Sequence, residues 1–118
     1  MKKQGKWSKN LYWEKEKGNM EPFQRFKKSN TENNLWIYIL TFGKEREIKN
    51  EEVRNLIFEK FGFLPGNLLT KRVLYRLKSQ GYIKKEKFKG KSAFSTTKKG
   101  IRELERMKIF SKELLKKV

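Results

Sequence analysis

The feature that most constrains the fold is residues 67–100, in which a basic helical pattern runs into two short alternating segments. Residues 67–80, NLLTKRVLYRLKSQ, place apolar side chains at helical spacing, with lysine and arginine on the opposite face. The segments YIKKEKF and SAFSTT then flank KGK, where a glycine with positive φ can close a hairpin. We therefore expect a basic helix followed by a hairpin, with Ile83 facing the core.

The flanking residues predict helices on both sides of this segment. LWIYILTFG, residues 35–43, forms a helical stripe that we expect Gly43 to close. A second helix is expected to begin at an Asn50 cap, with acidic residues in its first turn, and to end at Gly62. Thr97 should cap a long final helix. This order predicts a mainly α fold with a small β-hairpin (α+β), a winged helix-turn-helix.

The chain divides into an arm, a domain and a terminal helix. Residues 1–34 lack sustained periodicity and read as a basic arm with short helical turns after Ser8 and Pro22. Residues 35–100 form the predicted winged domain, and 101–118 a dimerisation helix. Aromatic rings in the arm could stack on bases or enter a minor groove, or they could pack on the domain or a dimer partner. These rings are Trp7, Tyr12, Trp13, Phe23 and Phe26.

The charge of the chain is distributed unevenly. The 118 residues carry a formal charge of +18, yet residues 35–66 contain equal numbers of basic and acidic side chains. Residues 67–100 contain eleven Lys or Arg and one acidic residue, Glu86. Lysine-rich surfaces can serve solubility alone, but an excess confined to one segment favours binding of a polyanion. The partner expected from this charge is a nucleic acid.

Several residue types are missing from the sequence. It contains no Cys and no His, and no Asp occurs either. These absences exclude disulfides, Ser-His-Asp triads and nearly all zinc sites, so we expect no enzyme, no metal and no cofactor. No apolar run approaches the ~20 residues that span a bilayer, and the basic N-terminus lacks the apolar stretch of a secretory signal. We therefore expect a cytoplasmic protein without a membrane partner.

Two motifs resemble those of the PadR and MarR winged-helix transcription regulators, including small archaeal members. LYRLKSQGYIKK, residues 74–85, is similar to the end of their recognition helix and the start of the wing. FSTTKKG, residues 94–100, resembles their second wing strand and following helix start, although Thr96 stands where leucine is usual. The resemblance covers about residues 35–118. It implies a DNA-binding domain whose basic helix enters a major groove.

That geometry implies a set of nucleic-acid-binding residues. Lys71 and Arg72 would reach base edges, with guanine the usual target, while Tyr75 and Arg76 would contact backbone or sugar. Asn67 at the helix start could hold a phosphate. The wing would contact phosphates or the minor groove. The full set is Asn67, Lys71, Arg72, Tyr75, Arg76, Lys85, Lys87, Lys89 and Lys91.

The final helix carries an apolar face that is too long for a small domain to cover. Its outer part consists of Met107, Phe110, Leu114, Leu115 and Val118. Two copies could bury this face across a two-fold axis, or the N-terminal arm could cover it within one chain. The sequence thus predicts a sequence-specific duplex DNA-binding protein, a dimeric transcriptional regulator. An RNA-binding protein of a ribonucleoprotein such as the ribosome is the main alternative, and a protein–protein adaptor is a third.

Overall fold

The computed structural model describes residues 20–118, which fall into two compact units with the boundary after Asn33. In the first unit, α2 (Pro22–Ser29) begins with proline in its first turn. The Glu21 N–H donates a hydrogen bond to the Gln24 side chain as part of a capping box. The helical turn expected after Pro22 is therefore confirmed. The turn expected after Ser8 lies outside the described residues.

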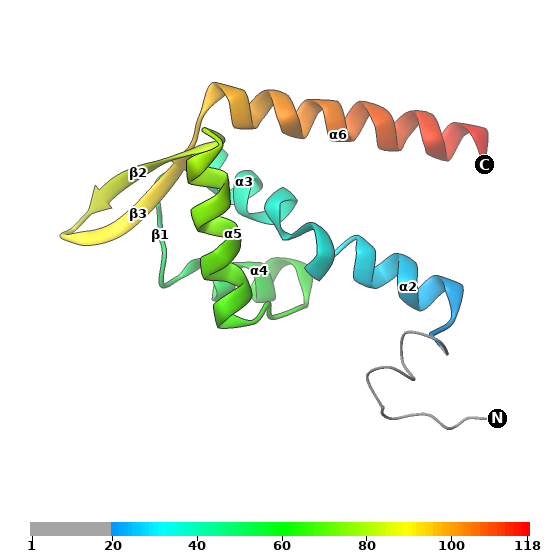
Figure 1. The fold of residues 1–118 in the computed structure, drawn as a ribbon, viewed down its shortest axis with the longest axis horizontal. Coiled ribbons are helices and arrows are strands. Elements are labelled where there is room, and N and C mark those ends of the chain that lie inside the picture. Colours follow the sequence, from blue (N-terminus) through cyan, green and yellow to red (C-terminus); the bar gives the residue numbers. More distant parts are fainter. Residues whose placement is uncertain (1–19) are drawn as a thin grey trace. The chain divides into compact units, whose positions relative to one another are not determined.

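The second unit has the predicted α+β architecture of a winged helix-turn-helix (Figure 1). A single 3-10 turn, η1 (Glu32–Asn34), leads into it. Its helices and strands are α3 (Leu35–Glu45), β1 (Ile48–Lys49), α4 (Val53–Phe61), α5 (Asn67–Ser79), β2 (Ile83–Phe88), β3 (Lys91–Thr96) and α6 (Lys98–Lys117).

The sheet has three antiparallel strands in the order β1-β3-β2, one more than the hairpin that the sequence predicts. The added strand, β1, is two residues long and pairs Ile48 with Phe94. The expected start of α4 at an Asn50 cap is also wrong, because Asn50 continues from this strand. The Asn50 N–H donates to the Ser92 carbonyl at 3.0 Å, so Asn50 extends the sheet and Glu52 occupies the N-cap position.

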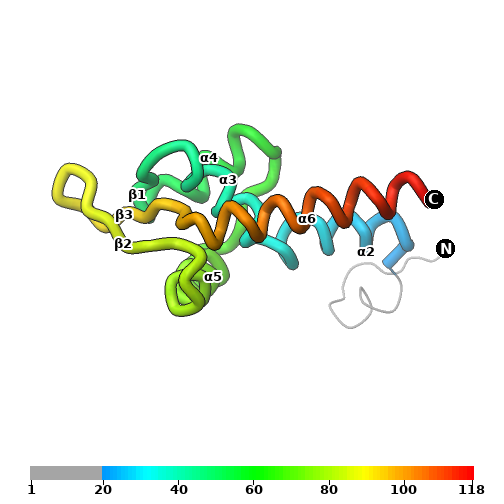
Figure 2. Tube along the Cα trace, turned by 90° about the horizontal axis from the view of Figure 1, so that it is seen from above, coloured from blue at the N-terminus to red at the C-terminus, as the bar shows by residue number. Residues whose placement is uncertain are grey.

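The β2–β3 hairpin forms the wing and projects away from the helices (Figure 2). Phe88 pairs with Lys91, so the turn consists of Lys89 and Gly90, both with positive φ, and Lys91 belongs to β3. Two such residues make the tight turn whose twist suits a β-hairpin. The turn is thus one residue shorter than the KGK segment of the sequence suggests.

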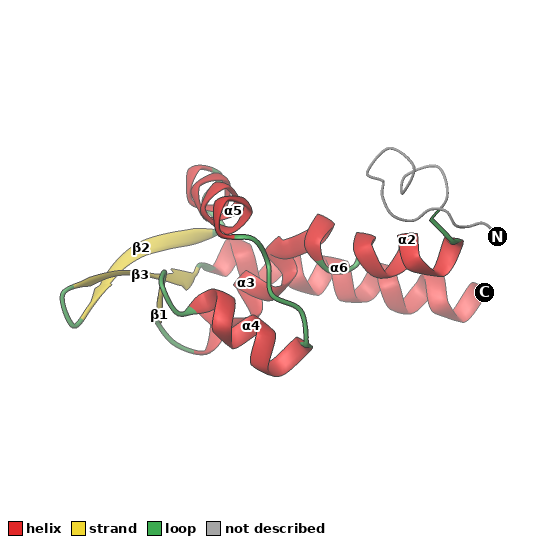
Figure 3. Ribbon diagram, turned by 90° about the horizontal axis from the view of Figure 1, so that it is seen from below, coloured by secondary structure: helices red, strands yellow, loops and turns green. Residues whose placement is uncertain are grey.

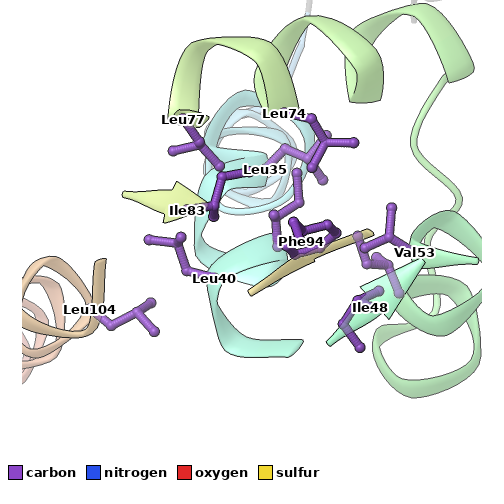
Figure 4. Packing of buried hydrophobic residues seen from close by; sticks show 11 residues of the cluster. Leu35, Leu40, Ile48, Val53, Leu74, Leu77, Ile83, Phe94 and Leu104 are labelled. Atoms are coloured by element: carbon purple, nitrogen blue, oxygen red, sulfur yellow. The ribbon is translucent and has the colours of Figure 1, made fainter. Parts of the chain in front are cut away.

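The core forms around α3, which contacts β3, α5 and α6 (Figure 4). Leu35 and Leu40 from α3 lie among side chains of the sheet and of the other helices, and Ile83 faces this core as expected. Gly43 does not end α3, which continues to Glu45. A Cβ at Gly43 would lie 2.6 Å from Oγ1 of Thr96, so this glycine permits close packing of α3 on the sheet.

The start of α6 is fixed to the end of α5 through Thr97. Its hydroxyl oxygen accepts a hydrogen bond from the Gly100 N–H at 3.2 Å, as predicted for the N-cap. The same hydroxyl donates to the Gly81 carbonyl at 2.7 Å. A Cβ at Gly100 would overlap the Tyr82 carbonyl oxygen, which explains the glycine in the FSTTKKG motif. Helix α6 therefore leaves the sheet in a defined direction.

Candidate nucleic-acid interface

Helix α5 is held against the core by one side and leaves its basic side exposed. Leu74 and Leu77 are buried in the core. Thr70 is also buried and donates a hydrogen bond to the Gly66 carbonyl at 2.7 Å, so it belongs to the interior and not to the exposed face. The helix ends before Gly81, whose φ of 84° favours glycine. The packing of α5 thus determines which of its residues can contact a ligand.

The exposed side of α5 carries every residue of this helix that the sequence singles out as a binding residue. Asn67, Lys71, Arg72, Tyr75 and Arg76 are all exposed, and 71% of the Tyr75 surface is accessible. Lys78, which the sequence analysis did not include, belongs to the same surface. A rigid helix therefore presents a row of cations without needing them for its own packing.

The wing lysines are exposed but do not share one face of the hairpin. Successive side chains of a strand point to opposite faces, so Lys85 and Lys87 lie on the same face as Ile83. Lys91 pairs with Phe88 and lies on the other face. The Lys91 ammonium is also 3.7 Å from the Glu51 carboxylate, in an exposed ion pair. Lys89 occupies the tip, with its ammonium 5.4 Å from the centre of the Phe88 ring.

A cleft of about 550 Å³ separates α5 from the sheet. Figure 3 shows α5 beside β2, the hairpin strand that it contacts. The floor of the cleft is apolar and includes Leu74, Ile83 and Phe94. Its cations come from three different elements: Arg54 from α4, Lys71 and Lys78 from α5, and Lys85 from β2. The structure thus brings the basic helix and the base of the wing onto one concave surface.

Arg54 is a cleft residue that sequence reasoning missed. Its Nε donates a hydrogen bond to the Pro65 carbonyl at 2.8 Å, which fixes the guanidinium near the start of α5. Asn67, at the start of α5, lines the same cleft. No local signal distinguishes Arg54 from other charged residues of residues 35–66, because its partner lies eleven positions further along the chain. The charge-balanced half of the domain therefore contributes a cation to the basic surface.

The corner between β1 and α4 supports one edge of the cleft. The Glu52 carboxylate accepts a hydrogen bond from the Lys49 N–H at 2.9 Å and lies 3.2 Å from the Arg46 guanidinium. The Lys49 N–H, with a further contribution from Arg46, holds the pKa of Glu52 below its usual value despite partial burial. Asn50 and Glu51, the preceding residues, line the cleft. An ionised Glu52 therefore stabilises the corner that positions them.

A second group of exposed residues lies on α6. Gly100 and Leu104 are buried, and Met107 is half-buried against the core. Beyond Met107 the predicted interface residues Phe110, Leu114, Leu115 and Val118 are exposed. In the other unit, Phe23 and Phe26 of α2 are exposed as well. The structure thus shows an apolar surface on the outer half of α6 whose partner remains a prediction.

The described residues give no sign of a metal site. Within residues 20–118, no group of three or more His, Cys, Asp or Glu side chains is placed to hold a metal ion. None of the helices in that range is both long and apolar enough to cross a bilayer.

Comparisons with known proteins identify the fold. No family model and no curated protein matches the sequence. Among solved structures, the chain is similar to F93 of STIV, a winged-helix DNA-binding protein. The TM-score is 0.62 at 17% identity, over 71% of this chain and 92% of that one. It is also similar to TA0346 of Thermoplasma acidophilum, a proposed transcriptional regulator. That TM-score is 0.52 at 19% identity, over 74% of this chain and 93% of that one. These similarities confirm the winged-helix fold.

Proposed function

We propose that this chain is a sequence-specific duplex DNA-binding protein, a dimeric transcriptional regulator of the PadR/MarR-like kind, acting on DNA in the cytoplasm. The observation that carries the proposal is the basic cleft. Cations from α4, α5 and β2 meet there, beside an exposed helix whose width suits a major groove. The proteins of similar fold, described as DNA-binding and as a proposed regulator, support the same conclusion.

In this proposal α5 enters the major groove and the wing contacts the flanking backbone. Lys71 and Arg72 reach base edges from the first turns of the helix, where helix-turn-helix proteins make their base contacts. Lys87 and Lys89 extend the positive surface to the tip of the hairpin. Asn67 and Arg54, which line the cleft near the start of α5, hold a phosphate in this proposal. The binding energy comes mainly from phosphate contacts and the selectivity from α5.

A second copy of the chain is proposed to cover the outer half of α6. Phe110, Leu115 and Val118 expose most of their surface, and a contiguous apolar surface of this kind is uncommon on a soluble monomer. Packing across a two-fold axis would bury both copies of this surface. It would also hold two α5 helices for neighbouring turns of a duplex.

An RNA-binding role is the second candidate, and the arm favours it. Helix α2 combines exposed Phe23 and Phe26 with Lys27, whose ammonium lies 5.5 Å from the centre of the Phe23 ring. Exposed aromatic rings beside cations suit stacking on unpaired bases. The same combination would suit a ribonucleoprotein.

Two measurements test the proposed function. Duplex affinity measured at several salt concentrations should give a slope of log K against log[salt] of about −5 to −8 per bound unit, because phosphate contacts release counterions. Sedimentation equilibrium at micromolar concentration should give a dimer. A slope near zero would contradict binding through the basic surface, and a monomer would contradict the two-fold arrangement.

A further inference from the structure

We propose that Leu68 and Tyr75 form an apolar ridge on α5 that recognises the C5-methyl groups of two thymines in the major groove. The inference rests on the proposed function and adds a specificity-determining pair to it. It also names the base pairs that such a site must contain. Leu68 was not among the residues singled out from the sequence, and Tyr75 was expected there to contact backbone or sugar and not a base.

The ridge follows from the helical positions of the two residues. Seven residues make close to two turns of an α-helix, so Leu68 and Tyr75 point in nearly the same direction. They are also highly exposed, with 69% and 71% of their surfaces accessible. These two side chains therefore mark an exposed line along α5, and Tyr75 also borders the cleft. We expect this line to enter a groove when the helix approaches one.

Cations lie on both sides of this line. Lys71 and Lys78 are on the side of the cleft, which they line. Arg72 and Arg76 are exposed on the other side of the helix and do not line it. In a major groove such an arrangement directs the outer cations, Arg76 and Lys78, to the two phosphate backbones. It leaves the line of Leu68 and Tyr75, with Lys71 and Arg72 beside it, over the base edges. Charge on both sides of the ridge thus suits the two phosphate backbones of a duplex groove.

The chemistry of the ridge selects among the base pairs. In the major groove the thymine methyl is the apolar group on the base edges, and apolar side chains recognise it. Leu68 offers only apolar atoms, and Tyr75 offers a ring with a terminal hydroxyl. A single exposed leucine elsewhere on the surface would need no explanation. At the centre of a basic helix face, leucine matches a thymine better than a base edge that requires a hydrogen bond.

The distance between the two residues sets the expected spacing of the thymines. Seven residues span about 10.5 Å along a helix axis, at about 1.5 Å per residue. For a helix that lies along the groove this corresponds to about three base pairs, at about 3.4 Å each. We therefore expect two A·T pairs, about three positions apart, under α5 in each half of the preferred site.

The experiment replaces thymine by deoxyuridine, which lacks only the C5-methyl group. The full-length protein first selects a preferred duplex from a random-sequence library, and each thymine of that duplex is then replaced singly. Two positions about three base pairs apart should each lose about fourfold in affinity, the effect of one buried methyl group. Replacement at the remaining thymines should have little effect.

Variants of the protein assign each position to its residue. Leu68→Ala should bind the preferred duplex several-fold more weakly and should no longer distinguish thymine from deoxyuridine at one position. Tyr75→Ala should do the same at the other position, whereas Tyr75→Phe should keep the discrimination because it keeps the ring. Ile109→Ala is the matched control, since it removes an exposed aliphatic side chain from the side of α6 opposite Met107 and the proposed dimer face, and it should leave the pattern unchanged.

The possible outcomes separate this inference from the proposed function. A selection that returns no preferred duplex would contradict both. A preferred duplex that is insensitive to deoxyuridine, or whose sensitivity persists in Leu68→Ala and Tyr75→Ala, would contradict the ridge alone. If Leu68→Ala weakened binding to preferred and random duplexes equally, Leu68 would position the helix without reading bases, and the inference would be wrong.

Discussion

Helices α5 and α6 both bury one side in the same core and expose the other, but their exposed sides differ in kind. On α5 the buried Leu74 and Leu77 lie opposite lysine and arginine side chains. On α6 the buried Leu104 lies near the start, and the outer half exposes large apolar residues such as Phe110 and Leu115. Neither exposed surface is needed to hold its helix in the domain.

This difference suits two different kinds of partner. A row of cations attracts a polyanion and gains little from burial against protein, whereas an apolar stripe gains free energy when another apolar surface covers it. If α5 binds DNA and α6 binds a second copy, changes in α5 should leave the dimer intact. Changes in α6 should weaken DNA binding only by separating the two half-sites. The following changes test that separation.

The largest effect is expected from Leu114→Glu/Leu115→Glu. Both leucines are exposed, at 48% and 72%, so the domain should remain folded while charge repels a second α6. Sedimentation equilibrium should show a monomer. Affinity for the preferred duplex should fall about 10²–10⁴-fold, because two half-sites are no longer bound together.

The control for this variant is Lys112→Gln/Lys116→Gln, which makes the same change in net charge at exposed polar positions of α6. It should remain dimeric. If the unmodified protein proved to be monomeric, the proposed dimer would be wrong and the RNA-binding alternative would gain support.

A smaller effect is expected from replacing Lys87, Lys89 and Lys91 by glutamine. Affinity should fall for all duplex sequences alike, by up to about a hundredfold at low salt, and the salt slope should flatten by about 2–3. The matched control replaces Lys108, Lys112 and Lys116 of α6 in the same way. Should both triple variants change the slope equally, the wing would contribute only net charge and would not contact phosphates.

Arg72→Ala should weaken binding mainly to the preferred duplex. The arginine is exposed on α5, and its loss should cost about 1–3 kcal/mol on the preferred site and much less on random DNA. Equilibrium binding to both duplexes gives the comparison, and Arg102→Ala, an exposed arginine of α6, serves as the control. Equal losses on both duplexes would show that Arg72 positions the helix and does not read bases.

The smallest effect concerns folding and not binding. Because the folded protein lowers the pKa of Glu52, its carboxylate stabilises the fold above the usual carboxyl pKa. This contribution is lost as the pH falls through the lowered, folded-state value. Unfolding by denaturant should therefore show Glu52→Gln to be slightly less stable than the unmodified protein near neutral pH and equally stable in strong acid. A difference that did not depend on pH would mean that the charge of Glu52 has no such role.

Local sequence signals predicted most of the fold. Gly62 adopts the left-handed conformation that ends α4, and Thr97 caps α6, because both roles depend on neighbouring backbone groups. Strand β1 was missed because two residues are too short to show alternation, and it exists through pairing with Phe94 far along the chain. Gly43 was misinterpreted for a similar reason, since its packing against Thr96 is a long-range contact.

The sequence predicted the positive charge of the candidate site but not the cleft that forms part of it. The lysines of α5 and the wing stood out in the sequence, and all are exposed in the structure. The cleft could not be foreseen, because its lining comes from α4, α5 and the sheet. Leu68 was overlooked because only charged and polar residues of the exposed face were considered, although its helical spacing from Tyr75 indicates that it points outward, and it is 69% exposed.

Duplex DNA is the proposed ligand of the basic surface formed by α5 and the wing. In a competition assay, the full-length protein is bound to a labelled preferred duplex and challenged with random duplex, structured RNA and single strands at several salt concentrations. We expect unlabelled preferred duplex to compete best at every salt concentration and to keep its advantage over random duplex as salt rises. If structured RNA displaced the duplex more effectively than any DNA tested, the proposal would be wrong, and the protein would be an RNA-binding winged helix.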